Sequence, residues 1–159
     1  EFTYDLIKNN KLTFEKSNND HRVVTFHDSC NVARGSNMGD IENGQFILPR
    51  EVIKAACNNF IDMPKNTIKS STFCCGGGAG LLTDDLIDLR IKGAKPRMHA
   101  LRKSEQESGV NTLAAICAIC KSQFSKVLPN YDFDPYMVVS VHQLVSDAIV
   151  LSESLKQKD

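Results

Sequence analysis

The chain has 159 residues, of which 42% are hydrophobic and 24% are charged, as in globular domains large enough to bury a core. Lys plus Arg and Asp plus Glu both total 19, and the resulting net charge of zero argues against general electrostatic binding of nucleic acid. No stretch reaches the roughly 18 apolar residues of a membrane span, and no secretory signal pattern opens the sequence.

Four segments have the β-branched and aromatic composition of strands. They are residues 22–26, 60–63, 112–116 and 137–141. Helical patterns separate these segments along the chain. Strands that alternate with helices predict an α/β fold, here a mostly parallel sheet of about four strands with helices on both faces, in Rossmann-like layering.

Helices are expected before, between and after the strands. They cover residues 3–9, a stretch from Pro49 to Cys57, residues 83–92 and 96–107, a stretch ending near Leu128 and another ending near Leu155. Pro49 is placed in a first turn, where the missing N–H is not needed. Gly93 and Pro96 are expected to separate the third helix from the fourth. Residues 31–46 are expected to form a loop.

The domain organisation follows from these elements. Residues 1–20 are expected to form an amino-terminal helix and linker, and residues 21–159 a cysteine-rich domain. The sequence opens on Glu1 and Phe2 without an initiator methionine. The chain is therefore expected to be a carboxyl-terminal part of a longer protein.

Five of the six cysteines form a pattern that indicates a metal site. They are Cys30, Cys74, Cys75, Cys117 and Cys120. Six cysteines are too few for a disulfide scaffold, and without a secretory signal the expected compartment is reducing. The first of the five follows one predicted strand and the last two follow another, so the carboxyl edge of a parallel sheet brings them together.

Three glycines follow the adjacent cysteine pair: Gly76, Gly77 and Gly78. Glycines fill no space in a core, but they let the backbone approach a bound group closely and point N–H donors at it. The run does not match G-x-G-x-x-G, because Leu81 stands where the third glycine is needed. Thiolates beside a bare, donating backbone indicate an anionic metal–sulfur centre.

Two alternatives remain open from the residues alone. Zinc takes four ligands, typically from paired C-x₂₋₄-C arms, and the chain offers five candidates and one such arm. A dithiol redox motif at Cys117 and Cys120 explains neither Cys30 nor the vicinal pair. The cysteine run of ordinary cubane clusters is absent. Cys57 lies in a helical pattern and is predicted to be a packing residue.

Two histidines are candidate catalytic residues. His27 precedes Cys30 by three positions, and His142 follows the fourth predicted strand. Either can hydrogen-bond a cluster sulfur or donate a proton to a product thiolate, and a purely structural role fits their positions equally well.

Several basic residues can balance the charge of the thiolates. They are Arg34, Arg90, Lys92 and Arg97. A solvated helix face is the expected position of the last three.

A single cysteine, a distant Cys-Cys-Gly and a distant C-x-x-C together resemble the cysteine-rich CCG domain of heterodisulfide reductases, over about residues 22–125. Longer segments are similar to the DsrK-like branch of that family. They are residues 25–34, 73–85, 114–124 and 139–147. Such proteins also have an amino-terminal ferredoxin-type domain, which this chain lacks, so it resembles their carboxyl-terminal half.

The resemblance implies a noncubane [4Fe–4S] cluster held by the five cysteines, at which a disulfide is cleaved in two one-electron steps. It implies that the domain reduces or oxidises a disulfide or trisulfide of a DsrC-like sulfur-carrier protein in dissimilatory sulfur metabolism. The implied partners are the membrane subunits of a DsrMKJOP-like complex and the ferredoxin-type domain of the full-length chain. The location implied is the cytoplasm, with membrane association through partner subunits. An isolated domain is expected to be inactive and to contain the cluster, zinc or no metal.

Overall fold

A small parallel sheet lies at the centre of the computed structural model, which describes residues 1–37, 41–80 and 83–151. Its strands are β1 (Val24–His27), β2 (Thr112–Ala115) and β3 (Val138–Ser140). They lie in the order β1-β2-β3, with β2 in the middle and all pairs parallel. The mostly parallel sheet predicted from the sequence is confirmed.

The sheet has three strands rather than the four that were expected. At residues 60–63 the chain makes a single parallel bridge, between Phe60 and Val24, and the N–H of Ile61 donates to the carbonyl of Val24 at 2.9 Å. Pro64 follows immediately and has no N–H with which to extend a ladder. The prediction of a full strand here is wrong, because the segment turns away after one bridge.

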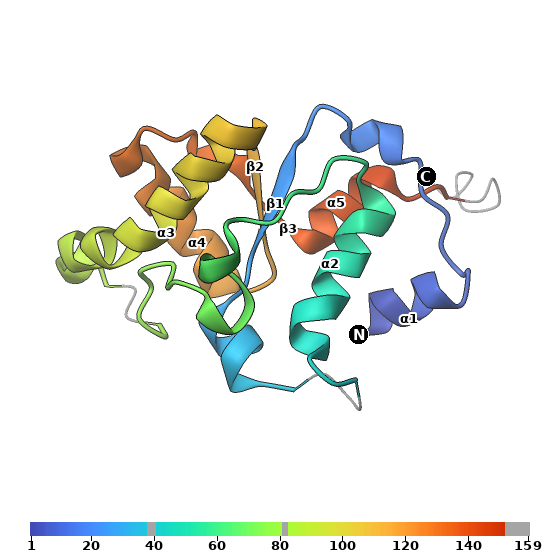
Figure 1. Cartoon of the computed structure of the whole chain (residues 1–159), viewed down its shortest axis with the longest axis horizontal. Coiled ribbons are helices and arrows are strands. Elements are labelled where there is room, and N and C mark those ends of the chain that lie inside the picture. The colour runs from blue at the N-terminus through green and yellow to red at the C-terminus, as the bar shows by residue number, and fades with distance from the viewer. Residues whose placement is uncertain (38–40, 81–82, 152–159) are drawn as a thin grey trace.

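Helices cover both faces of the sheet, as predicted. They are α1 (Phe2–Lys8), α2 (Gly44–Ala56), α3 (Ile87–Ser108), α4 (Ala118–Val127) and α5 (Val141–Ala148). Figure 1 shows α3 and α4 on one side of the strands and α2 and α5 on the other, with α1 beside α2. Within the described residues, no helix is both long and apolar enough to cross a membrane.

Side chains alternate between the two faces along each strand. In β2, Leu113 packs into the core on the side of α3 and α4, whereas Ala114 packs on the side of α2 and α5. In β1, His27 lies in register with Ala115. The pairing therefore directs the His27 side chain to the face that α3 and α4 cover, at the carboxyl end of its strand.

Helix α2 begins five residues earlier than the sequence suggested. Pro49 was expected in a first turn, but it lies inside a helix that starts at Gly44. Its missing N–H leaves the carbonyl of Gln45 without a helical donor. Gln45 is only partly buried, so water can supply that hydrogen bond.

Helix α3 continues through the residues that were expected to break it. Gly93 and Pro96 both lie inside one helix of 22 residues. Because Pro96 has no N–H, the carbonyl of Lys92 loses its helical hydrogen bond, and Lys92 is an exposed residue. Met98 and Leu101 are completely buried on the inner face of the same helix. Tertiary packing along that face outweighs the local preference for a break.

Helix α5 ends at Ala148, before the expected end near Leu155. Ile149 instead forms an antiparallel bridge with Phe14, which attaches this end of the chain to the amino-terminal segment. Residues 152–159, in which the rest of that predicted helix falls, lie outside the described residues.

The segment between β1 and α2 opens with helical structure rather than a loop. Residues Cys30–Arg34 form one π-helical turn. Such turns are rare and occur frequently at functional sites. Residues 38–40 of the predicted loop at 31–46 lie outside the described residues.

Candidate metal–sulfur centre

One small cavity is lined by all five cysteines that the sequence singled out. They are Cys30, Cys74, Cys75, Cys117 and Cys120. The first belongs to the turn after β1, the next two to the segment before α3, and the last two to the start of α4. Their convergence at the carboxyl edge of the sheet is the arrangement expected from the strand order. Their role as ligands stays a prediction.

Helix α4 directs N–H donors at the first cysteine of the C-x-x-C pair. Cys117 is the residue that caps the helix, and Cys120 lies in its first turn. Burial alone would raise the pKa of the Cys117 thiol, but the N–H groups of Cys120 and Ile119 and the hydroxyl of Ser29 outweigh burial and lower it. The start of this helix therefore favours a thiolate.

The glycine run supplies a second set of donors. The N–H of Gly76 donates to the Sγ atom of Cys74 at 3.3 Å. Gly76 and Gly78 both have positive φ angles, of 90° and 51°, which are left-handed conformations that favour glycine. The sequence predicted a backbone that points N–H groups at a bound anion, and the N–H of Gly76 points at the sulfur of a candidate ligand, Cys74.

The vicinal thiols hold their protons more tightly than free cysteine does. A hydrogen bond with Cys75 is the largest cause that raises the pKa of Cys74, followed by burial. A hydrogen bond with Cys120 raises the pKa of Cys75 to about 12, against an opposing hydrogen bond with Cys74. Because a metal binds the thiolate, these protons must leave when a metal enters.

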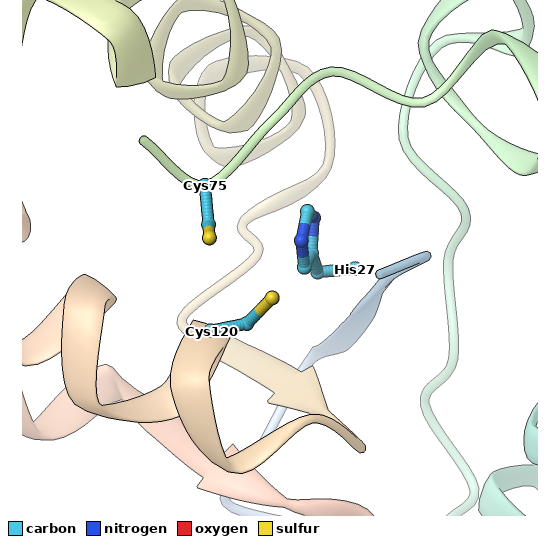
Figure 2. A group of neighbouring side chains, drawn as sticks. All are labelled: His27, Cys75 and Cys120. Carbon is cyan, nitrogen blue, oxygen red and sulfur yellow. The ribbon is translucent and has the colours of Figure 1, made fainter. Parts of the chain in front are cut away.

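His27 lies beside Cys75 and Cys120, buried and without a hydrogen-bond partner among the described residues. Figure 2 shows its ring beside the side chains of Cys75 and Cys120, with ligand atoms that all lie within 4.8 Å of one another. The ring is 1% exposed, and neither nitrogen has a hydrogen-bond partner among the described residues. Burial and the nearby charge of Arg97 lower the pKa of His27, which keeps the imidazole neutral.

The donor set fits a metal–sulfur group. Buried polar atoms almost always have partners, so the two free nitrogens of His27 indicate that something else belongs beside them. Five thiols and two sets of backbone donors surround the same space. The cavity measures about 30 Å³, the size of one or two water molecules.

The structure does not bring His142 to the cysteines. Its side chain is exposed near the start of α5 and lines a different cavity, together with Pro49, Val52 and Ile116. The reason is that α5 packs with α2 on the opposite face of the sheet from α3 and α4.

Cys57 lies apart from the other five cysteines. It is buried in the core between the sheet, α2 and α5, where burial raises the pKa of its thiol to about 11. Its surroundings are those of a packing residue.

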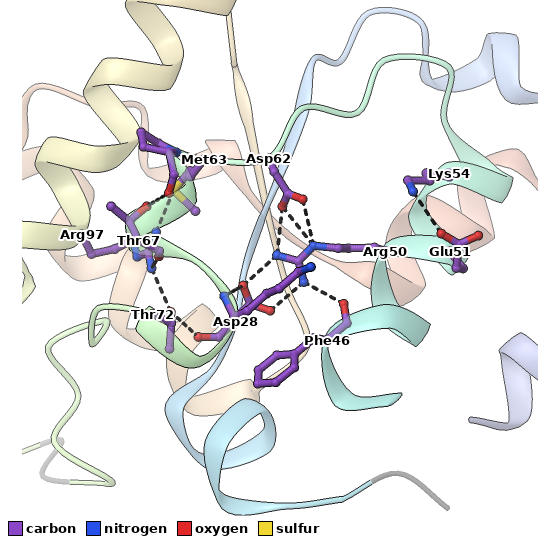
Figure 3. A network of polar contacts seen from close by, with 12 residues as sticks. Asp28, Phe46, Arg50, Glu51, Lys54, Asp62, Met63, Thr67, Thr72 and Arg97 are labelled. Atoms are coloured by element: carbon purple, nitrogen blue, oxygen red, sulfur yellow. Dashed lines mark hydrogen bonds and ion pairs between the residues drawn. The ribbon is translucent and has the colours of Figure 1, made fainter. Parts of the chain in front are cut away.

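Sequence reasoning missed a buried ion pair beneath the site. Asp28 follows β1, and both of its carboxylate oxygens accept hydrogen bonds at 2.7 Å from Arg50 of α2. Figure 3 shows this pair together with Asp62, which contacts the same guanidinium. The N–H of Lys69 and the hydroxyl of Thr72 also donate to Asp28, to its carboxylate and its carbonyl oxygen respectively. Asp28 thus joins the chain just before the Cys30 turn to α2 and to the segment that leads to Cys74.

Two arginines expected on a solvated face are instead buried. Arg90 is 3% exposed and Arg97 is fully buried, both on the inner face of α3. They are seven residues apart and share that face with Ala94 and Leu101. This spacing is two helical turns, a pattern in the sequence that would have identified them as inward-facing. Lys92 is exposed, as expected.

The fold and the site define a class of protein, a cysteine-rich α/β domain that brings thiols from three chain segments to one sheet edge. The sequence profile of the CCG family, described as "Cysteine-rich domain", matches residues 24–125. The chain belongs to this family of CCG cysteine-rich domains, and the resemblance noted from its motifs is confirmed.

The chain is similar to components of larger oxidoreductases. It is 45% identical over 152 residues to the Hdr-like menaquinol oxidoreductase iron-sulfur subunit 2 of Archaeoglobus fulgidus, covering 96% of the chain and 26% of the relative. It is 30% identical to one subunit of the dihydromethanophenazine:CoB--CoM heterodisulfide reductase of Methanosarcina mazei, covering 95% of the chain and 33% of that protein. The chain thus spans a quarter to a third of these relatives. No solved structure matches it.

Proposed function

We propose that this domain holds a noncubane [4Fe–4S] cluster and transfers electrons in an oxidoreductase of the heterodisulfide reductase type. The proposed ligands are Cys30, Cys74, Cys75, Cys117 and Cys120. The observation that carries the proposal is their convergence on one cavity from three separate segments. The name of the Archaeoglobus relative as an iron-sulfur subunit supports it.

The residues of the chain would perform three tasks around such a group. The five thiolates bind it, and the bound cluster supplies one-electron transfer. The N–H of Gly76 and those at the start of α4 stabilise negative charge on the Cys74 and Cys117 sulfurs. The buried neutral ring of His27 has a ring N–H free to donate to a sulfur.

The proposed reaction is the reduction of a disulfide or trisulfide on a DsrC-like sulfur-carrier protein, or its reverse, the oxidation of the corresponding thiols. For a disulfide, the S–S bond breaks, and two electrons and two protons convert its sulfurs into two thiols. In the reducing direction the electrons would come from a ferredoxin-type domain of the same full-length chain and from membrane subunits of a DsrMKJOP-like complex, and in the oxidising direction they would pass to these partners. The domain would then work in the cytoplasm, at the membrane through its partners. The relationship to the Methanosarcina heterodisulfide reductase supports a sulfur–sulfur bond as substrate.

Anaerobic reconstitution with iron and sulfide tests the cluster. Absorption and EPR spectra should show an iron–sulfur cluster. Chemical analysis should find about four iron atoms and four acid-labile sulfides per chain, as the proposed [4Fe–4S] composition requires. Replacing any one of the five cysteines by serine should reduce or abolish incorporation. Cys57→Ala is the matched control and should incorporate normally, because Cys57 packs on the other face of the sheet. A folded wild-type chain that takes up no iron and sulfide would contradict the proposal.

A structural zinc site is the second candidate, favoured by one observation. His27, Cys75 and Cys120 place three ligand atoms within 4.8 Å of one another, a donor set that zinc accepts. Metal analysis of the purified protein separates the two. Zinc without acid-labile sulfide, lost on His27→Leu as well as on substitution of either cysteine, would support a docking domain stabilised by zinc.

A further inference from the structure

The guanidinium of Arg97 is completely buried beside the site without an ionic partner among the described residues. Figure 3 shows Nη1 donating to the Sδ atom of Met63 at 2.8 Å, and Nη2 donating to the carbonyl of Thr67 at 2.5 Å and the hydroxyl of Thr72 at 2.8 Å. Its Nε has no hydrogen-bond partner within the same described ranges. In the part of the chain that the structure describes, no carboxylate lies within 4 Å of it.

Asp28 is the carboxylate that acts on Arg97 from a distance, and it is already paired with Arg50. Both carboxylate oxygens of Asp28 accept hydrogen bonds from Arg50, and one of them also accepts from the N–H of Lys69. Burial lowers the pKa of Arg97 to about 10, although Asp28, Cys120 and Cys75 act in the opposite direction. A buried cation without a paired anion is unfavourable in free energy, so its position calls for a negative group nearby.

The thiols are the nearby groups that can become negative. Cys75 and Cys120 lie close enough to Arg97 to act electrostatically on its guanidinium, and the charge of Arg97 acts on His27 beside them. The hydroxyl of Thr72, which accepts from the Arg97 guanidinium, belongs to the segment that leads directly to the vicinal cysteines. As free thiols these groups are neutral, and they gain negative charge when they give up their protons to a metal.

We propose that Arg97 is the buried counter-charge of the thiolate-ligated centre at Cys75 and Cys120. Its charge strengthens metal binding, because each thiolate formed is attracted to the guanidinium in a site of low dielectric. The second consequence, which rests on the proposed function, is a higher reduction potential. Reduction adds negative charge to the centre, and a fixed cation nearby stabilises the reduced form. Arg97 is a positioning residue in this account and does not contact substrate.

Cobalt binding to the metal-free protein tests the first consequence without requiring a cluster. Co²⁺ is titrated anaerobically and followed by its thiolate charge-transfer absorption. Arg97→Gln should weaken Co²⁺ binding by roughly tenfold, the effect of one charge at moderate distance and intermediate dielectric. Arg97→Lys should retain most of the affinity. Arg102→Gln is the matched control, because Arg102 lies on the same helix, partly buried, and contacts Glu105, the Phe133 ring and the carbonyl of Tyr131 rather than the cysteines. It should bind cobalt like the wild type.

An EPR-monitored redox titration of the iron–sulfur-reconstituted protein tests the second consequence. Arg97→Gln should shift the midpoint potential to a more negative value, by about the 59 mV that corresponds to a tenfold change for one electron. Arg97→Lys and Arg102→Gln should stay near the wild type. A purely structural role would predict a loss of fold with no shift in the protein that remains folded. If Arg97→Gln does not fold, Arg97→Met, which is apolar and of similar length, takes its place.

The two titrations distinguish this inference from the proposed function. If wild-type protein takes up no iron and sulfide, but its cobalt affinity falls in Arg97→Gln and recovers in Arg97→Lys, the counter-charge stands and the cluster proposal fails. If the cluster assembles and neither affinity nor potential depends on the charge at position 97, the counter-charge is overturned. Absence of both cobalt and iron–sulfur binding in folded wild-type protein overturns both.

Discussion

Gly76 lies directly against the backbone of Arg90, so that a Cβ atom at Gly76 would approach the Arg90 carbonyl oxygen to 2.2 Å. The φ angle of Gly76 is 90°, which L side chains rarely adopt. Helix α3 and the Cys74–Cys75 segment can therefore pack this closely only with glycine at the contact. The residue of α3 that faces Gly76 is a second glycine, Gly93. A Cβ atom at Gly93 would lie 3.8 Å from the α-carbon of Gly76, an ordinary van der Waals distance.

Gly76→Ala is expected to destabilise the protein by about 3 kcal/mol or more, because strained backbone and a backbone clash add together. Urea unfolding of the metal-free protein measures the change. Gly93→Ala is the control on the other side of the contact. It has ordinary van der Waals room in a helix, and should leave stability unchanged or raise it by up to about 1 kcal/mol. Equal effects of the two substitutions would show that the contact is not close.

Asp28→Asn is expected to cost about 3 kcal/mol, because it leaves the buried guanidinium of Arg50 without its bidentate partner. The loss should be smaller than for a fully isolated charge, since Asp62 still contacts Arg50. Thermal unfolding of the metal-free protein measures it.

Glu51→Gln is the matched control for that substitution. Glu51 lies on the same helix and pairs with Lys54 at the surface, so its loss should change stability by less than about 0.5 kcal/mol. An Asp28→Asn variant as stable as this control would show that the buried pair contributes nothing to the fold.

Features of the fold and site that depend on neighbouring residues in the sequence could be predicted, whereas those that depend on packing between distant segments could not. The positions of Cys30, Cys117 and Cys120 after strands were enough to place them at one edge, because parallel strands share their carboxyl side. His142 also follows a strand, yet α5 packs on the other face of the sheet. Which face a crossover helix takes is decided by packing against residues distant in the sequence, and no local pattern near His142 encodes it.

The helix boundaries show the same limit. Gly93 and Pro96 have the local preferences of a helix break, but the buried face of α3 continues through them. Charge was equally misleading, since Arg90 and Arg97 are charged residues on that inner face. A charged side chain predicts solvent exposure only where no buried group interacts favourably with its charge. At Arg97 the buried thiols of Cys75 and Cys120 are such groups.

His27→Leu is expected to stabilise the metal-free protein by about 1 kcal/mol, because it removes a buried ring whose two nitrogens have no partners among the described residues. Part of the gain is offset by the lost edge-to-face contact with Phe124, whose ring centroid lies 4.8 Å away. Denaturant unfolding with a chelator present measures the difference. His99→Leu, at an exposed position of α3, should have little effect. A large destabilisation by His27→Leu would mean that the imidazole is satisfied without a metal centre.

Asp147→Asn is expected to lower stability at neutral pH by about 1 kcal/mol and to have no effect in strong acid. Burial alone would raise the pKa of Asp147, but hydrogen bonds from Arg22 at 2.7 Å and from Gln143 outweigh burial and lower it. A carboxyl whose pKa is lower in the folded state stabilises the fold above its unfolded value of about 3.9, and this contribution disappears as the pH falls through the folded value. Unfolding curves from pH 7 to pH 2 should therefore converge for the variant and the wild type at the acid end. Glu107→Gln, which removes only an exposed pair with Lys103, should follow the wild type at every pH, and parallel curves for Asp147→Asn would contradict the assigned pKa shift.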